Sequence, residues 1–264
     1  MDLKNKVVWV TGASSGIGEA LVYELAKKGC KMILSSRKTE ALERVKSNCN
    51  LNDDDILILP LDLAAHDSMH SKTDAVLEKF GRIDCVVHNG GISQRAFAAD
   101  TDFSVDKTIM DVNYFGAVAL TKAVLPVFLK QKSGYFVVIS SLTGKLGAKL
   151  RSAYAASKHA LHGFFDSLRA EYWDQNIKVT IVCPGFIQTN VSVNAITGDG
   201  STYNKMDETQ AKGMPVNACA GKIIRAIENE KEEMVVGGKE IAAIYLKRFF
   251  PRLLSMLMQK RKVT

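Results

Sequence analysis

Short apolar runs that alternate with longer segments of helical spacing constrain this chain's fold more than any other feature. The alternation predicts repeated βαβ units, and therefore one doubly wound α/β domain of about seven parallel strands with helices on both faces. The expected strands are 6–10, 31–35, 55–59, 84–88, 135–140, 178–183 and 232–236. The expected helices lie near 17–28, 39–48, 67–80, 105–131, 153–174 and 217–229.

The chain is expected to form a single domain over residues 1–264, because no repeat, low-complexity tract or Pro/Gly-rich linker divides it. One polar, turn-rich segment at 190–216 interrupts the alternation before the expected helix at 217–229. Long loops in compact domains often serve as active-site lids. We therefore expect this segment to border the substrate.

The positive charge of the chain is concentrated at one end. The formal net charge is +7, and residues 239–264 carry seven Lys/Arg against one Glu. The rest of the chain is nearly neutral and lacks the broad basic face, interleaved with aromatic residues, that nucleic-acid binders present. We therefore expect no nucleic-acid partner for the body of the protein.

Sequence features at the N-terminus and at the cysteines bear on the compartment. The first residues lead directly into an apolar strand without the charged and apolar regions of a secretory signal, so a cytoplasmic location is expected. The five cysteines are scattered without paired spacing, and Cys85 and Cys183 lie inside apolar runs. Neither a disulfide framework nor a metal site is predicted.

A glycine-rich turn, Thr11-Gly12-Ala13-Ser14-Ser15-Gly16-Ile17-Gly18, joins the first strand to the first helix. Glycines also mark ordinary turns, but this context suits a pyrophosphate. Gly12, Gly16 and Gly18 permit a tight turn and close backbone approach, and the helix N-terminus faces the anion. The turn therefore predicts a dinucleotide site on a Rossmann-type sheet.

The end of the second strand indicates which dinucleotide is bound. An acidic residue there would hold the 2′-hydroxyl of NAD, whereas a basic one favours the 2′-phosphate of NADP. The strand ends Leu34-Ser35-Ser36-Arg37-Lys38 and offers no carboxylate before Glu40. Arg37 supplies a forked donor suited to phosphate, so NADP(H) is predicted. The alternative is a solvated Arg/Lys pair.

A tyrosine and a lysine at i and i+4, Tyr154 and Lys158, share one face of an expected helix. A free phenol has a pKa of about 10, and a neighbouring positive charge favours the phenolate. The pair could make Tyr154 a general acid/base at a carbonyl or alcohol oxygen. Taken alone, such a pair is more often structural.

Two further polar residues give the pair a context. Ser141 follows the fifth strand at its carboxyl end, where open α/β sheets bind ligands, and could orient a substrate oxygen. Ser140 is assigned no such role. Asn113 lies inside the expected helix 105–131, where its propensity is poor. Its amide could replace a lost backbone hydrogen bond or hold a water that leads toward Lys158.

These motifs together, with Pro184-Gly185, resemble the short-chain dehydrogenase/reductase (SDR) family over roughly residues 3–238. The resemblance implies an NADP-dependent oxidoreductase that acts on a small-molecule carbonyl or alcohol, with Asn113, Ser141, Tyr154 and Lys158 as catalytic residues. It implies that Lys158 also binds the nicotinamide ribose, and that the protein is a homodimer or homotetramer. The cofactor contacts that it implies are Gly12, Ser14, Gly16, Ile17, Gly18, Arg37, Asp62, Leu63, Asn89, Tyr154, Lys158, Ile187 and Thr189.

One position departs from the family pattern, and two segments indicate a branch. His88-Asn89-Gly90-Gly91 stands where the family usually has Asn-Asn-Ala-Gly, and His88 is expected to be packed rather than catalytic. Residues 89–95 and 156–165 are most similar to the branch named dehydrogenase/reductase member seven, related to the 11β-hydroxysteroid dehydrogenases. That branch implies lipophilic substrates of the ketone, steroid or retinoid type.

The C-terminal segment 239–264 leaves two interpretations open. Its apolar clusters, Pro251 and basic residues would suit a segment lying on an anionic membrane surface, but not one spanning it. Alternatively, it forms a helix that closes over the substrate pocket and ends in a solvated basic tail. Besides an active enzyme, two other functions are compatible with the sequence. One is a relative that binds NADP(H) without turnover, and the other is a membrane or nucleic-acid partner that acts through the tail.

Overall fold

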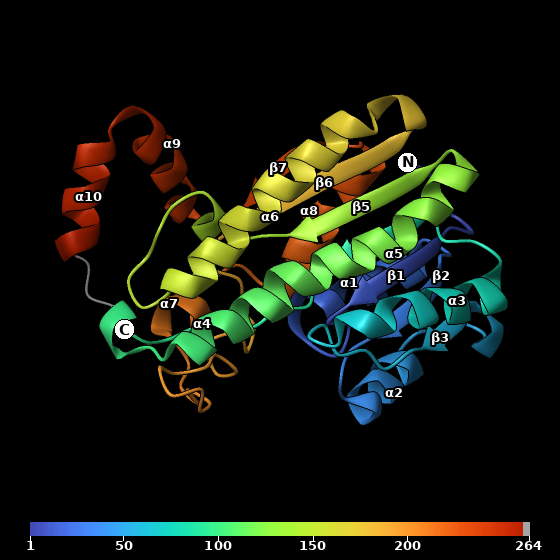
Figure 1. Cartoon of the computed structure of the whole chain (residues 1–264), viewed down its shortest axis with the longest axis horizontal. Coiled ribbons are helices and arrows are strands. Elements are labelled where there is room, and N and C mark those ends of the chain that lie inside the picture. The colour runs from blue at the N-terminus through green and yellow to red at the C-terminus, as the bar shows by residue number, and fades with distance from the viewer. Residues whose placement is uncertain (261–264) are drawn as a thin grey trace.

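The computed structural model describes residues 1–260 and has one parallel sheet of seven strands in the order β3-β2-β1-β4-β5-β6-β7 (Figure 1). This confirms the expected fold class, and each strand lies within two residues of its expected range. The strands are β1 (Val7–Thr11), β2 (Lys31–Ser35), β3 (Ile56–Ile58), β4 (Cys85–His88), β5 (Gly134–Ile139), β6 (Ile177–Pro184) and β7 (Glu233–Val236).

Helices cover both faces of the sheet. On one face, α1 (Gly16–Lys27), α2 (Thr39–Ser47) and α8 (Val216–Glu228) enclose one apolar core. On the other face, α3 (Met69–Phe80), α5 (Gly116–Gln131) and α6 (Ser152–Glu171) enclose a second one. Strand β1 contributes to both, because Val8 and Val10 face the first core while Val7 and Trp9 face the second. A strand buried on both faces must be apolar throughout, which explains the continuous run VVWV.

The strand order reverses between β1 and β4, which pair directly in the middle of the sheet. From β1 the chain continues outward to β2 and β3, whereas from β4 it continues to β5, β6 and β7. Outside the carboxyl ends of two such strands the connecting loops diverge and leave a crevice. The topology therefore fixes the position of the ligand site.

The single helix expected at 105–131 is corrected to three consecutive segments. Helix α4 (Phe103–Met110) begins two residues earlier, a π-helical turn follows at Asp111–Phe115, and α5 continues from Gly116. The π turn contains Asn113, whose side chain bonds to the backbone of a neighbouring loop. Single π turns inside α-helices occur frequently at functional sites.

The segment 190–216 lies across the carboxyl side of the sheet and has structure of its own. It contains the short helix α7 (Glu208–Ala211), and Ile196 forms isolated bridges to Gln94 and Thr202. A third bridge joins Ile187 to Met214. The segment is therefore fastened at several points along its length.

The C-terminal segment forms two helices, α9 (Ala242–Phe249) and α10 (Pro251–Lys260), which stand at one end of the molecule away from the sheet (Figure 1). Lys247 Nζ donates to Lys145 O at 2.8 Å, and Lys149 Nζ donates to Gln259 O at 2.8 Å. The pair of helices is thereby attached to the loop that follows β5. Residues 261 and 262 of the predicted basic tail lie outside the described residues.

Within residues 1–260, the helical stretch Phe103–Gln131 is long and apolar enough to cross a membrane, judged by length and composition alone. Its Leu120, Val124 and Phe128 are buried against the sheet. The core helix of a globular domain passes the same test, and this packing is that of a core helix.

Candidate active site

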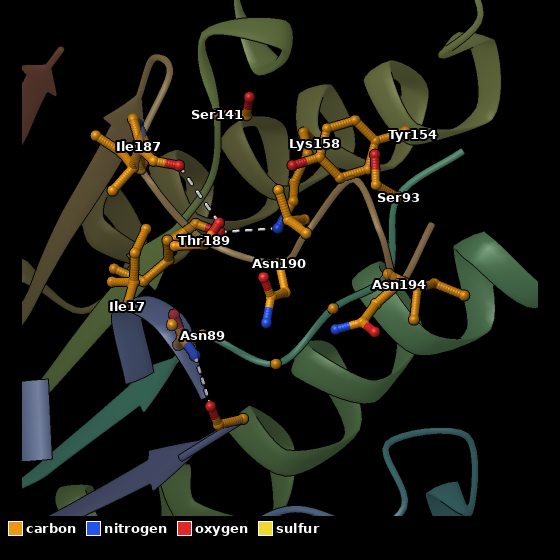
Figure 2. Close-up of a pocket in the computed structure, with 18 of the residues that line it drawn as sticks. Ile17, Asn89, Ser93, Ser141, Tyr154, Lys158, Ile187, Thr189, Asn190 and Asn194 are labelled. Atoms are coloured by element: carbon orange, nitrogen blue, oxygen red, sulfur yellow. Dashed lines mark hydrogen bonds between the residues drawn. The ribbon is translucent and has the colours of Figure 1, made fainter. Parts of the chain in front are cut away.

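A cavity of about 950 Å³ follows the carboxyl ends of the strands, where the sheet topology places it. It extends from the glycine turn and Arg37 to Tyr154, and onward to Met258 of α10. Of the residues that the sequence assigned to the site, all line this cavity except Gly18 and Asn113. One cavity therefore joins the predicted dinucleotide site to the predicted catalytic residues (Figure 2).

The glycine turn has a backbone that only glycine adopts readily. Gly12 and Gly16 have φ of +64° and +58°. A Cβ on Gly12 would lie 2.8 Å from Asn89 Nδ2, and one on Gly18 would overlap the carbonyl oxygen of Gly12. Gly18 does not line the cavity, but its missing Cβ leaves room for the backbone of Gly12. The close-packed turn at the start of α1 fits a dinucleotide pyrophosphate.

Asn89 fixes the wall of the cofactor site. Its Nδ2 donates to Thr11 O and Gly12 O, each at 3.1 Å, so the amide ties the loop after β4 to the glycine turn. Arg37 is exposed just beyond β2, and Asp62 and Leu63 follow β3. This arrangement matches the expected path of an adenosine across the three strands.

Beyond Pro184-Gly185, the loop with Ile187 and Thr189 faces the middle of the cavity (Figure 2). It is held by Gln210 of α7, whose Nε2 donates to Ile187 O and, at 3.3 Å, to Thr189 Oγ1. Glu240 holds the preceding residues, because its Oε1 accepts from Phe186 N at 3.0 Å and from Gly238 N at 2.9 Å. Neither Gln210 nor Glu240 was predicted from the sequence as a site residue. Neither belongs to a local motif.

Tyr154, Ser141 and Lys158 converge on the cavity as expected (Figure 2). Lys158 Nζ lies 5.8 Å from the centroid of the Tyr154 ring and donates to Ile139 O at 2.8 Å. Ser141 Oγ accepts bonds from Thr143 N at 3.1 Å and from Thr143 Oγ1 at 2.9 Å. Since both lone pairs of the Ser141 hydroxyl are then used, its proton is directed to another acceptor.

The surroundings of the Tyr154 phenol act on its pKa in opposite directions. Burial raises the pKa of the phenol above its ordinary value, while a hydrogen bond with Ser141 and the charges of Arg151 and Arg95 lower it. The role that the sequence gave to Lys158, as the charge that favours the phenolate, stays a prediction. Lys158 is itself buried, and burial lowers its pKa to about 8.

Asn113 acts as a brace. Its Oδ1 accepts from Ile92 N at 2.8 Å, and its Nδ2 donates to Ile92 O at 2.9 Å and to Ser157 Oγ at 3.0 Å. The amide thus joins the loop after β4 to helix α6. The amide thereby bonds to backbone groups of Ile92, while the role of Asn113 in holding a water that leads toward Lys158 stays a prediction.

Ser140, which was assigned no role, is buried behind the site. Its Oγ lies 3.3 Å from Lys158 O and 3.0 Å from His162 Nε2. His162, Cys183 and Glu233 place potential metal ligands within 4.8 Å of one another. However, Lys145 Nζ lies 2.5 Å from Glu233 Oε2, and its positive charge opposes a cation there. The predicted lack of a metal site stays a prediction.

His88 is packed, as expected from the sequence. Its ring stacks on Phe136 and lies 5.4 Å from the Phe165 ring, and its Nε2 is 2.9 Å from Thr121 Oγ1. Burial lowers its pKa to about 3, so the ring is neutral near pH 7. His88 does not line the cavity.

Comparisons with known proteins agree with this geometry. A family model described as short chain dehydrogenase matches residues 6–199. A Drosophila melanogaster protein named dehydrogenase/reductase SDR family protein 7-like is 46% identical over 99% of this chain and 82% of its own length. The human dehydrogenase/reductase SDR family member 7 is 41% identical over 95% of this chain and 76% of its own length.

Solved structures show the same fold. A short-chain dehydrogenase/reductase from Burkholderia phymatum, in complex with NAD, has a TM-score of 0.83 at 20% identity and covers 100% of this chain and 98% of its own. A short-chain dehydrogenase from Streptomyces avermitilis has a TM-score of 0.81 at 27% identity and covers 97% of this chain and 96% of its own.

Proposed function

This chain belongs to the short-chain dehydrogenase/reductase family, in the branch of member seven, and from that premise we propose that it is an NADP(H)-dependent enzyme that interconverts a carbonyl and an alcohol. One observation carries the proposal. The Ser141 and Tyr154 side chains face the same cavity as the glycine turn of the dinucleotide site. An oxidoreductase needs this juxtaposition, because hydride and proton must reach the two ends of one C=O bond.

The chain's own residues supply the proton and orient the substrate. Ser141 donates a hydrogen bond to the carbonyl oxygen, because its own oxygen is occupied by Thr143. Tyr154 transfers its phenolic proton to that oxygen and is reprotonated from solvent. When bound, NADPH supplies the hydride that the carbonyl carbon accepts. Oxidation of an alcohol reverses both transfers, with Tyr154 as the base.

The preference for NADP(H) rests on Arg37. Its guanidinium is exposed beside the cavity just after β2, and no carboxylate lies among residues 31–38 to bind a ribose 2′-hydroxyl. Replacement of Arg37 with Glu should raise the KM for NADPH about tenfold or more and lower the KM for NADH. Arg225→Glu, at an exposed position on α8, is the control. If the KM for NADPH did not change in Arg37→Glu, Arg37 would not select NADP(H).

The substrate is proposed to be a lipophilic ketone or alcohol. The cavity that Tyr154 lines is also lined by apolar side chains from three parts of the chain, which are Leu142 and Leu146, Val191 and Ile196, and Met258. Burial of an apolar substrate against such a surface contributes about 25 cal/mol per Å². A screen of steroid, retinoid and simple aryl ketones with NADPH tests this. Higher kcat/KM for small polar aldehydes would contradict it.

The experiment that tests the reaction itself is NADPH oxidation by Tyr154→Phe. The variant should lose about 100-fold or more in kcat, because the ring stays and only the acid is removed. Tyr172→Phe is the control, since Tyr172 packs on the outer edge of a core, away from the cavity. Equal turnover by Tyr154→Phe and the unchanged protein would exclude the mechanism. NADPH binding without turnover in every variant would favour a non-catalytic relative.

We also propose that the protein pairs with a second copy through the face of α4, α5 and α6. Phe103 and Phe115 are 71% and 46% exposed on this face, although large apolar side chains are usually covered. Tyr114 and Phe164 form an edge-to-face aromatic pair beside Phe115. Phe115→Glu should shift the mass measured by sedimentation toward the monomer. An unchanged mass would remove this face as the interface.

A contact between the C-terminal helices and an anionic lipid surface is a separate proposal. Tyr245, Phe249 and Phe250 are each more than 60% exposed, and Lys247, Arg248 and Arg252 lie among them. Apolar side chains flanked by cations are typical of helices that lie in a membrane interface. In a flotation experiment with phosphatidylserine vesicles, the unchanged protein should float with the vesicles, whereas the double variant Phe249→Ser/Phe250→Ser should stay in the lower fractions. Equal flotation of both would reject the contact.

A further inference from the structure

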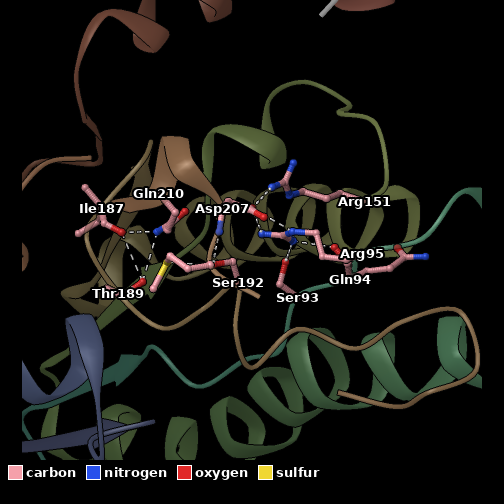
Figure 3. Close-up of polar contacts among 10 residues, drawn as sticks. Ser93, Gln94, Arg95, Arg151, Ile187, Thr189, Ser192, Asp207 and Gln210 are labelled. Atoms are coloured by element: carbon pink, nitrogen blue, oxygen red, sulfur yellow. Dashed lines mark hydrogen bonds and ion pairs between the residues drawn. The ribbon is translucent and has the colours of Figure 1, made fainter. Parts of the chain in front are cut away.

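Asp207 carries a buried carboxylate in the segment that covers the active-site cavity. Its side chain is only 2% exposed, and it immediately precedes α7. Its Oδ2 accepts from Arg95 Nε at 3.0 Å, from Arg95 Nη2 at 2.7 Å and from Arg151 Nη2 at 2.9 Å (Figure 3). Two cations from separate loops thus meet on one carboxylate of the covering segment.

The arginine at the centre of this group is held rigidly. The Arg95 side chain is also 2% exposed, and its Nη1 donates to Ser93 Oγ at 2.8 Å and to Gln94 O at 2.7 Å. A buried guanidinium requires a counter-charge, which Asp207 provides. Without the carboxylate, two like charges would face each other in a dry site.

Other bonds fasten the same part of the covering segment to the loop after β4. Ile196 N donates to Ser93 O, and Arg95 N donates to Ile196 O, each at 2.9 Å. Asp207 N donates to Ser192 Oγ at 3.2 Å, which closes residues 192–207 into a compact unit. Asp207 contributes the ion pairs of this attachment, whereas the other contacts are neutral hydrogen bonds.

The attachment continues into the catalytic helix. Arg151 directly precedes α6, and Ala153 N in its first turn donates to Gln94 Oε1 at 3.0 Å. Gln94 is fully buried, and Ala153 is adjacent to Tyr154. Residues 94 and 95 therefore hold the covering segment on one side and the start of the catalytic helix on the other.

We propose that Asp207 is a positioning residue that latches segment 190–207 onto Arg95 and Arg151, so that closure of the substrate pocket and placement of Tyr154 depend on one ion-paired group. The inference rests on the proposed function of Tyr154. The latch acts on the carbonyl substrate, because Asp207 bonds to Arg95, to Arg151 at the start of the helix that carries Tyr154, and to Ser192, and none of these residues belongs to the glycine turn. Its loss should therefore affect the carbonyl substrate more than NADPH.

The first test follows amide exchange and needs no activity. In Asp207→Asn, hydrogen–deuterium exchange of peptides within 190–207 and of the first turn of α6 should become about tenfold faster or more. Asp199→Asn is the matched control, because Asp199 lies in the same segment but is exposed and bonds only within its own turn. Unchanged exchange in Asp207→Asn, or an equal increase in β1 and β2, would overturn the latch.

The second test separates substrate from cofactor. Asp207→Asn should raise the KM for the carbonyl substrate about tenfold while the KM for NADPH changes less than about twofold. Arg95→Lys keeps the charge but loses the two-point contact, so a smaller increase in the same KM is expected. Equal increases in both KM values would overturn the latch. If the unchanged protein turns over no carbonyl, the proposed function fails, while the exchange experiment still decides the latch.

Discussion

Lys158 Nζ donates a 2.8 Å hydrogen bond to the carbonyl oxygen of Ile139, the last residue of β5. The bond fixes the buried ammonium 5.8 Å from the centroid of the Tyr154 ring, beside the cavity. Burial disfavours the charged form of lysine, and the pKa of Lys158 accordingly falls to about 8. Lys158 is therefore mostly protonated near pH 7 and loses its proton near pH 8.

The first prediction concerns the pH dependence of carbonyl reduction. Below pH 8 Lys158 is mostly protonated, and above its pKa the charge is lost. The family resemblance implies that Lys158 binds the nicotinamide ribose, and if it does so as the ammonium, kcat/KM should decline above about pH 8. The kcat/KM profile of the free enzyme from pH 6 to 10 measures this. A profile that stays level to pH 10 would contradict the assignment.

A second prediction concerns acid stability and His88. The folded-state pKa of His88 is depressed to about 3 by burial, against an ordinary value of 6.5. Between pH 6.5 and 3, His88 is therefore protonated in the unfolded chain but not in the folded one. The folded state loses stability as the pH falls below 6.5. Between pH 7 and 5 the free energy of unfolding should fall by about 2 kcal/mol on account of His88.

Urea unfolding at pH 7 and pH 5 measures this change. His88→Asn, the residue usual in the family, should lose less stability over that interval than the unchanged protein. His70→Asn, at an exposed position on α3, should keep the full change. If the free energy of unfolding changed equally between the two pH values in all three proteins, the pKa of His88 would be the same in the folded and the unfolded chain.

The third prediction tests the glycine turn. A Cβ on Gly18 would overlap Gly12 O and Asn89 Nδ2, so Gly18→Ala must displace the turn that faces the pyrophosphate. Binding of NADPH, measured by fluorescence titration, should weaken about tenfold or more. Gly221→Ala on α8 meets no atom within 4 Å and should stabilise the fold by about 0.5 to 1 kcal/mol without affecting NADPH. Normal affinity in Gly18→Ala would show that the turn does not carry the cofactor.

The fold and the motif residues could be predicted because their signals are local. A strand buried on both faces shows as an apolar run, and the ends of parallel strands lie on one side of the sheet, which placed Ser141 beside Tyr154. The missed contacts join distant residues. Arg95 and Asp207 are 112 positions apart, and Gln94 and Ala153 are 59 apart. Nothing in the sequence near either partner indicates the other.

Asn113 lies between these two cases. Its poor helical propensity indicated that it was unusual inside a helix, and the hydrogen bond to a backbone was among the roles considered. The π turn at Asp111–Phe115 was not predicted. In that turn the Asn113 amide bonds to the backbone of Ile92, which lies in the loop after β4 and is 21 positions away in the sequence.

The last prediction concerns Gln94, which caps the catalytic helix from another loop. Its Oε1 accepts from Ala153 N at 3.0 Å, and its Nε2 donates to Thr101 Oγ1 at 2.9 Å. Gln94→Leu leaves the Ala153 N–H buried without an acceptor, which costs about 1 to 3 kcal/mol and loosens the turn that carries Tyr154. We expect kcat to fall about tenfold while the affinity for NADPH is kept.

Two variants separate the cap from general packing at this position. Gln94→Glu keeps an acceptor at the positive end of the helix and should retain most of the activity. Thr101→Val removes the other partner of Gln94 and should change kcat little, since the bond to Ala153 remains. If Thr101→Val lowered kcat as much as Gln94→Leu, Gln94 would act through its loop rather than through the helix. A loss in Gln94→Leu alone, recovered in Gln94→Glu, assigns the effect to the single N–H that precedes Tyr154.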